Sequence, residues 1–204
     1  MKKFTAVLLI VASLFCLTAC DSQDYEKANA LFSQGKYDEA KAIYVELGDY
    51  EDSAEKVKEC DYAKACQLME QEEPGQAAER FEALGAYKDS AEKLAQCQLQ
   101  QIDQLIQGTW KNTGMTVATM DQYFTFKDGR VKAELFINGK SSLANEGDYR
   151  IDVKEQKVYI CYDFIISTTG KKPNTEEKKL FAYTFDGENF VLKMDADGDL
   201  MEKM

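Results

Sequence analysis

The sequence predicts an α+β protein with two domains, a helix-pair repeat followed by an antiparallel β-barrel or sandwich of about eight strands. Three observations predict this fold. Residues 24–60 recur as residues 61–97, with a period of 37 and 16 identical positions. The apolar period then changes from helical to alternating at Gly108, which is typical of a change from helices to strands. A short apolar segment ahead of both parts is not expected to belong to the folded protein.

Each copy of the repeat is expected to form two helices. Apolar residues lie at helical spacing on both sides of Gly35-Lys36, and Gly48 is expected to end the second helix. A final helix is expected from Ser90 to about Gln107. Two aspartates precede helices and have a glutamate at the third helical position, so we expect capping boxes at the pairs Asp52 with Glu55 and Asp89 with Glu92.

The first copy carries a pattern of small and aromatic residues across its helix pair. The small residues are Ala28 and Ala40, the turn glycine is Gly35, and the aromatic residues are Tyr37 and Tyr44. This pattern resembles the tetratricopeptide repeat (TPR), although the period is 37 residues rather than the 34 of that family.

The resemblance implies a protein or peptide partner that lies along a concave face of the helices. The residues expected to line this face are Asn29, Ser33, Cys66 and Glu70. An alternative is that the repeats serve only as a rigid spacer above a membrane, because fold alone does not determine function.

The C-terminal part alternates apolar and polar residues with a period of two, as half-buried strands do. Hairpin turns are expected at Asp128-Gly129, Asn138-Gly139 and Asp186-Gly187. Strands are expected from Trp110, over 131–137, 149–153, 158–164, 181–185 and 190–194, and from Leu200.

Gly108-Thr109-Trp110 and the strand meander that follows resemble the start of the lipocalin and calycin barrels. The resemblance implies that Trp110 packs across the barrel floor and that the interior binds a small apolar ligand. A barrel filled by its own side chains, or a flattened sandwich, remains an alternative for a domain of this length.

The N-terminus has the features of a secretory signal, with a basic head at Met1-Lys2-Lys3 and an apolar run over 4–17. The run is too short to span a bilayer. Leu17-Thr18-Ala19-Cys20 resembles the lipobox of bacterial lipoproteins, which implies cleavage after Ala19 and a lipid on Cys20. We therefore expect a protein anchored by its lipid to the outer face of the plasma membrane. Its expected parts are a signal peptide at 1–19, a lipidated tether at 20–23, helical repeats at 24–107 and a lipocalin-like β domain at 108–204.

Composition argues against several functions. The formal charge is −11, and removal of the signal with its two lysines makes it −13, so nucleic acid is not an expected partner. The chain has no histidine and no nucleophile or nucleotide motif, so we expect neither an enzyme nor a cofactor. The other cysteines of the exported part are expected to be buried free thiols, because free cysteine behaves like a small apolar residue. Disulfides are the alternative, since an exported protein can hold them. These cysteines are Cys60, Cys66, Cys97 and Cys161.

Three carboxylates near the C-terminus, Asp195, Asp197 and Asp199, are the only candidate for a metal site, which would bind calcium. Their spacing departs from the EF-hand loop, so a solvated turn is the preferred interpretation and no metal is expected. The sequence thus predicts a non-catalytic lipoprotein that binds or scaffolds a protein partner at the cell envelope, or alternatively a carrier of a small apolar ligand.

Overall fold

The structure is a computed structural model that describes residues 20–167, 170–174, 176–194 and 198–204. Its contacts divide the chain into two compact units, one up to Cys97 and one from Gln98 onward. The boundary lies inside helix α5 (Ser90–Ile106), so the first turns of α5 belong to the helical unit and the last turns to the β unit.

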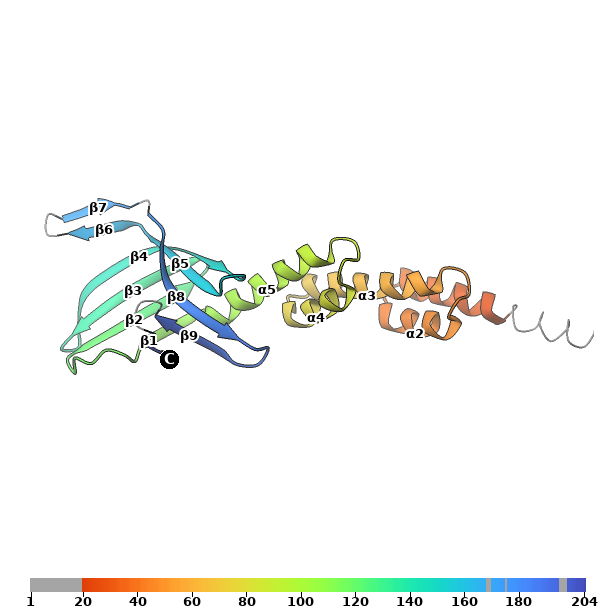
Figure 1. Cartoon of the computed structure of the whole chain (residues 1–204), viewed down its shortest axis with the longest axis horizontal. Helices are drawn as coiled ribbons and strands as arrows, with labels where there is room; N and C mark the ends of the chain where they lie inside the picture. The colour runs from red at the N-terminus through yellow and green to blue at the C-terminus, as the bar shows by residue number, and fades with distance from the viewer. Residues whose placement is uncertain (1–19, 168–169, 175, 195–197) are drawn as a thin grey trace, which may run out of the picture. The chain divides into compact units, whose positions relative to one another are not determined.

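The helical unit contains the predicted helix pairs (Figure 1). A helix at residues 20–33 is followed by α2 (Tyr37–Leu47), α3 (Ser53–Glu70), α4 (Pro74–Leu84) and the start of α5. Gly48 follows α2 with φ of 59° and Gly85 follows α4 with φ of 58°. A left-handed residue at this position ends a helix, and glycine adopts it without a steric penalty from a Cβ atom. The predicted end of the second helix at Gly48 is therefore confirmed.

The two copies of the repeat also share their tertiary contacts. The hydroxyl of Tyr25 donates a hydrogen bond to Asp52, and the hydroxyl of Tyr62 donates one to Asp89, its equivalent one repeat later. These contacts correct the predicted capping box at Asp52, because the Asp52 side chain makes no capping hydrogen bond to α3. The Asp52 carboxylate instead accepts the hydrogen bond from the Tyr25 hydroxyl. Repetition of the contact explains why tyrosine and aspartate recur at the same spacing in both copies.

Small residues allow the helices of each pair to pack closely. Ala28, Ala40, Ala65 and Ala77 are fully buried, and Tyr44 and Phe81 occupy equivalent core positions in the two copies. Two apolar clusters result, one for each copy of the repeat. Cys60 and Cys97 are buried free thiols in these clusters, and burial raises the pKa of Cys60 to about 11. Both cysteines therefore act as small apolar core residues.

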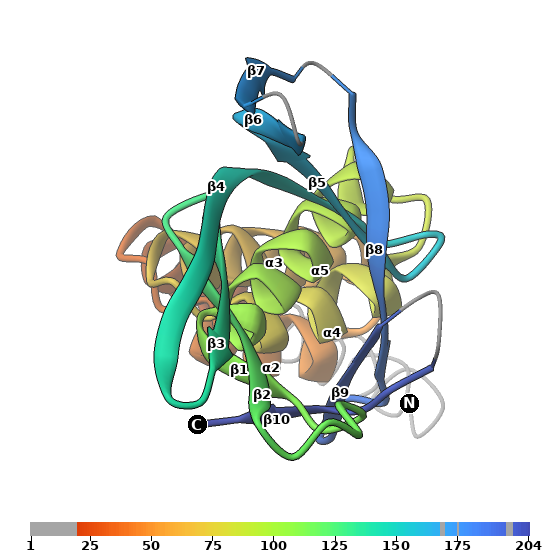
Figure 2. The same cartoon turned by 90° about the vertical axis from the view of Figure 1, so that its left-hand side faces the viewer.

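The β unit is a nearly closed antiparallel barrel of eight strands, which confirms the predicted α+β fold (Figures 1 and 2). The strand order around the sheet is β10-β1-β2-β3-β4-β5-β8-β9, and a bridge between Lys193 and Leu200 brings its two edges together. The strands are β1 (Gly108–Asn112), β2 (Met120–Lys127), β3 (Arg130–Ile137), β4 (Lys140–Asp152), β5 (Lys157–Tyr162), β8 (Lys178–Phe185), β9 (Phe190–Met194) and β10 (Met201–Lys203).

The turns agree with the sequence, but three strands do not. β2 lies outside every strand expected from the sequence, and β4 begins at Lys140 rather than near Tyr149. Asp128-Gly129 and Asn138-Gly139 have positive φ at both positions, as the tight hairpin turn requires. The strand predicted over 158–164 ends instead at Tyr162. A bend at Asp163 leads into a separate hairpin, β6 (Phe164–Ser167) and β7 (Gly170–Pro173), that extends the chain away from the barrel sheet (Figure 1).

The barrel core is filled at the end where α5 enters it. Ile102 and Ile106 of α5 pack with buried aromatic and aliphatic side chains from the strands. The Trp110 indole is buried and donates a hydrogen bond to the carbonyl of Ile106 at 2.7 Å. The other fully buried strand residues are Phe124, Phe126, Val131, Val158, Ile160, Phe181 and Leu192. Trp110 therefore has the structural role at the barrel floor that the sequence predicts.

Candidate functional site

The helical unit has a groove of about 360 Å³ that follows one face of α3. Six of its lining residues lie on α3 at positions that share one helical stripe, from Glu59 to Glu70. Phe32, Tyr37 and Lys88 complete the walls from other helices and loops. Residues far apart in the chain therefore converge here, and half-buried aromatic rings provide apolar contact surface. The α3 residues are Glu59, Tyr62, Ala63, Cys66, Gln67 and Glu70.

At one end of the groove, aromatic rings and a carboxylate surround an ammonium group. The Lys88 ammonium lies 4.7 Å from the centre of the Tyr62 ring and 5.2 Å from that of Tyr87. It also lies 3.8 Å from the Glu59 carboxylate, whose other oxygen binds Lys56 at 2.8 Å. This end of the groove therefore stabilises a positive charge by a cation–π contact and a weak ion pair.

At the other end lies the carboxylate of Glu70. Glu70 is exposed, and among the described residues it makes no hydrogen bond or ion pair. Phe32 and Tyr37, which line the same groove, pack edge to face with 5.2 Å between ring centres. A bound segment would therefore meet an apolar surface and an unused hydrogen-bond acceptor.

The structure brings together two of the four residues predicted to line a binding face. Cys66 and Glu70 lie in the groove, whereas Asn29 and Ser33 are absent from its walls. Asn29 accepts a hydrogen bond from the Tyr44 hydroxyl at 2.7 Å, and Ser33 donates one to the Asn29 carbonyl at 2.9 Å. In the first copy, Asn29 and Ser33 thus form hydrogen bonds within the helical unit. Their equivalents in the second copy, Cys66 and Glu70, line the groove.

Four residues of the groove were not among those predicted to line a binding face, namely Phe32, Tyr37, Tyr62 and Lys88. Phe32 and Tyr62 do pack against the apolar clusters, yet both remain half-buried and line the groove. A usable signal was the difference between copies, because Lys88 replaces Glu51 in a block that is otherwise nearly identical. No local pattern shows that Lys88 contacts Tyr62.

The barrel interior differs between its two ends. Strand register places Leu135 opposite Leu143, on the same side of the sheet as the buried Val131. Leu135 and Ile137 are only half-buried, and Leu143 is 45% exposed. The end near the β3–β4 turn therefore presents apolar inner side chains to solvent, whereas the end near α5 is filled. This arrangement is compatible with lipocalin-like binding of an apolar ligand.

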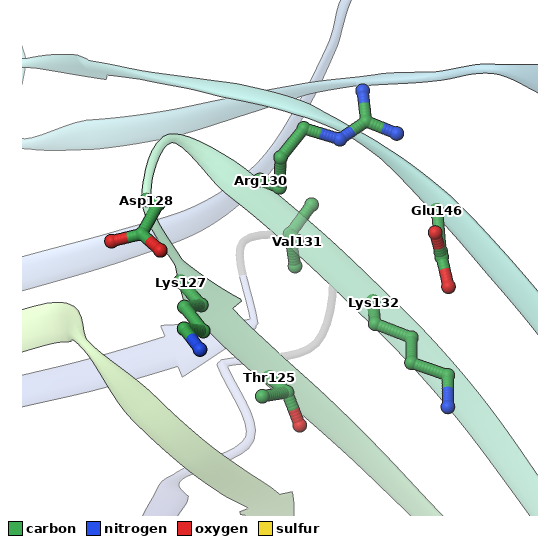
Figure 3. Close-up of a pocket in the computed structure, with 7 residues that line it drawn as sticks. All are labelled: Thr125, Lys127, Asp128, Arg130, Val131, Lys132 and Glu146. Atoms are coloured by element: carbon green, nitrogen blue, oxygen red, sulfur yellow. The ribbon is translucent and has the colours of Figure 1, made fainter.

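A second hollow, of about 450 Å³, lies on the β2–β3 hairpin and β4 (Figure 3). Figure 3 shows Arg130 turned away from Lys127 and Thr125. Arg130 binds Asp148 at 2.7 Å and Asp163 at 2.6 Å, and it holds the pKa of Asp163 below its ordinary value. Its charge is thus already compensated, so this hollow is a weaker candidate for a site than the groove.

The remaining predicted sites are only partly described. Cys20 is exposed, and its thiol lies 3.9 Å from the Asp24 carboxylate. Asp195 and Asp197 lie outside the described residues, and the Asp199 carboxylate packs against Gly114. Within the part of the chain that is described, no cluster of three acidic, cysteine or histidine side chains fits a metal ion. No described helix combines the length and hydropathy needed to cross a membrane.

Comparisons with known proteins identify no relative of this chain. No protein-family model matches the chain, and no match was found among curated proteins or solved structures.

Proposed function

We propose that this protein is a non-catalytic lipoprotein of the bacterial cell envelope that binds a protein or peptide partner through the groove of its helical unit. The lipobox-like sequence Leu17-Thr18-Ala19-Cys20 supports an acyl anchor at Cys20 on the outer face of the plasma membrane. The absence of histidine and of nucleotide motifs supports binding rather than catalysis.

The groove along α3 is the observation that carries this proposal. It combines half-buried aromatic rings, which are enriched at the energetic centres of protein interfaces, with charged groups at both ends. A spacer above the membrane needs no such surface. The groove also contains Cys66 and Glu70, two of the four residues that the resemblance to the TPR implied for a binding face.

Photo-crosslinking from within the groove tests the proposal. A photoreactive amino acid at Gln67, which lines the groove, is compared in cells with the same amino acid at Glu79, an exposed position on α4 outside it. We expect a discrete protein adduct from Gln67 that Ala63→Arg abolishes by filling the groove, with unchanged circular dichroism. No adduct, or the same adduct from both positions, would contradict the proposal.

A second candidate function is binding of a small apolar ligand by the barrel. The partly exposed inner residues Leu135, Ile137 and Leu143 favour it, because apolar side chains inside a barrel mouth suit an apolar ligand. A fluorescent apolar probe such as N-phenylnaphthylamine should bind the full-length protein, and Leu135→Arg should weaken binding. Equal fluorescence with both proteins would argue against a site in the barrel.

A further inference from the structure

The acidic excess of the protein is concentrated in the unit that contains the groove. Residues 21–97 include nine basic and 19 acidic side chains, a formal charge of −10. Residues 98–204 include 14 basic and 17 acidic side chains, a formal charge of −3. A field of this sign attracts a positively charged partner and repels an acidic one.

The groove itself already holds a cation supplied by the chain. Lys88 places its ammonium 4.7 Å from the centre of the Tyr62 ring and 3.8 Å from Glu59. The ion pair lies near the outer limit for such a contact, and Lys88 is 44% exposed. An ammonium or guanidinium group from a partner can therefore replace Lys88 at this position without loss of a strong internal contact.

The two carboxylates of the groove, Glu59 and Glu70, define the distance between two binding positions for cations. Glu59 and Glu70 are 11 positions apart on α3, which is about 16 Å along a helix. An extended peptide covers this distance in about five residues at roughly 3.3 Å each. The aromatic rings of Phe32, Tyr37 and Tyr62 line the same groove as the two carboxylates.

We propose that the partner segment is basic and extended, with two lysine or arginine residues about five positions apart that bind at Glu59 and Glu70. The first cation lies over the Tyr62 ring in place of Lys88, and an apolar residue between the two packs on Phe32 and Tyr37. This inference rests on the proposed role of the groove in binding a protein segment, and it specifies the chemistry of that segment.

Synthetic peptides test the inference with the full-length protein in a mild detergent. The probe is a labelled peptide of nine residues with lysine at positions 2 and 7, leucine at position 5 and serine elsewhere. Two matched peptides carry glutamine or glutamate in place of both lysines. Fluorescence anisotropy should show binding of the lysine peptide at least about tenfold tighter than the glutamine peptide, and weaker binding at higher salt. The glutamate peptide should not bind.

Variants separate the groove from general attraction to an acidic surface. Glu70→Gln should weaken binding of the lysine peptide about fivefold, whereas the matched control Glu79→Gln removes the same charge outside the groove and should change it little. Lys88→Gln should strengthen binding, because it removes the competing cation. Equal weakening by the two glutamate variants, or weaker binding by Lys88→Gln, would overturn the inference.

The two proposals fail in different ways. If the glutamine or glutamate peptide binds best, and Ala63→Arg prevents that binding, the groove still binds peptides but the basic partner is wrong. If the crosslinking position in the groove gives no adduct in cells, the proposed function itself fails, whatever the peptides do.

Discussion

At the scale of single residues, Trp110 joins the helix to the barrel within the β unit. Its indole N–H satisfies the Ile106 carbonyl, one of the carbonyls at the end of α5 that lack a partner in the helix. Lys203 of β10 donates to the neighbouring Leu105 carbonyl at 2.9 Å and lies over the Trp110 ring at 5.4 Å. The Trp110 side chain therefore fills the barrel floor and contacts both the end of α5 and strand β10.

Trp110→Phe should lower the free energy of unfolding of the β unit by about 2 kcal/mol, because it removes a buried hydrogen bond and leaves the carbonyl unpaired. Urea unfolding followed by far-ultraviolet circular dichroism measures the change. Tyr123→Phe, a conservative change of a half-buried strand residue, is the control and should have little effect. An unchanged midpoint for Trp110→Phe would show that the bond is not important for stability.

Cys20 carries the second prediction at this scale. If its thiol bears the lipid, Cys20→Ser removes the attachment atom, and the protein should no longer incorporate an alkyne-labelled fatty acid. The wild-type protein should remain in carbonate-washed membranes, since acyl chains contribute about 0.8 kcal/mol for each buried methylene group. Labelling of the serine variant, or an unlabelled wild-type protein, would exclude the anchor at this position.

At the scale of elements, the barrel depends on one close approach between neighbouring strands. A Cβ atom on Gly147 of β4 would lie 2.2 Å from the carbonyl oxygen of Cys161 and 2.5 Å from the Cα atom of Tyr162. Both are backbone atoms, so neither can move without displacing β5. The glycine therefore permits β4 to cross β5 at this distance, as glycines do where two backbones meet.

Gly147→Ala should destabilise the barrel by about 3 kcal/mol or more, or prevent it from folding, because the added methyl group overlaps rigid backbone. Gly139→Ala is the matched control. It replaces a turn glycine with φ of 73° and open space around its Cβ position, so only about 1 kcal/mol of conformational strain is expected. Similar unfolding midpoints for the two variants would show that the strands separate easily at Gly147.

At the scale of the whole molecule, buried tyrosines make stability depend on alkaline pH. Burial raises the pKa of Tyr44 in the helical unit, and of Tyr162 and Tyr183 in the barrel, to about 12. A raised pKa means that the folded protein holds the proton more tightly than the unfolded chain, whose tyrosines titrate near 10. The contribution of these tyrosines to the free energy of unfolding is complete below pH 10, and it is lost as the pH rises toward 12.

We therefore expect the free energy of unfolding to fall between pH 9 and pH 11, by about 1 kcal/mol for each of these tyrosines at pH 11. Tyr183→Phe separates this effect from the titration of lysines. The Tyr183 hydroxyl is buried and has no hydrogen-bond partner in the described structure, so the variant should match or exceed wild-type stability at pH 7. Its decline above pH 10 should be shallower, and identical pH profiles would contradict the assignment.

Local patterns predicted the helices, most strands and the hairpin turns because each depends on neighbouring residues. The 37-residue repeat predicted the helix pairs, and the change of period at Gly108 predicted the change from helices to strands. The first strand begins at Gly108, two residues before the predicted Trp110. Positive φ at Gly48 and at Asn138-Gly139 followed from residues that tolerate it. The strand predicted over 158–164 was too long. The alternation of residues continues past Tyr162, whereas the pairing of β5 with β4 ends at Tyr162 and Phe164 pairs with β7.

The sequence by itself determined the α+β class and the order of a helical part followed by an antiparallel β part. It also indicated four candidate residues, of which Cys66 and Glu70 lie in the groove. Only the tertiary structure decided that Lys88 lies over the Tyr62 ring and that the barrel is filled at one end. It also decided that Asp52 accepts a hydrogen bond from Tyr25 rather than capping α3. The reason is physical. Helical and alternating periods are set by backbone geometry between near neighbours, whereas a groove or a filled core depends on packing between segments that are distant in the chain.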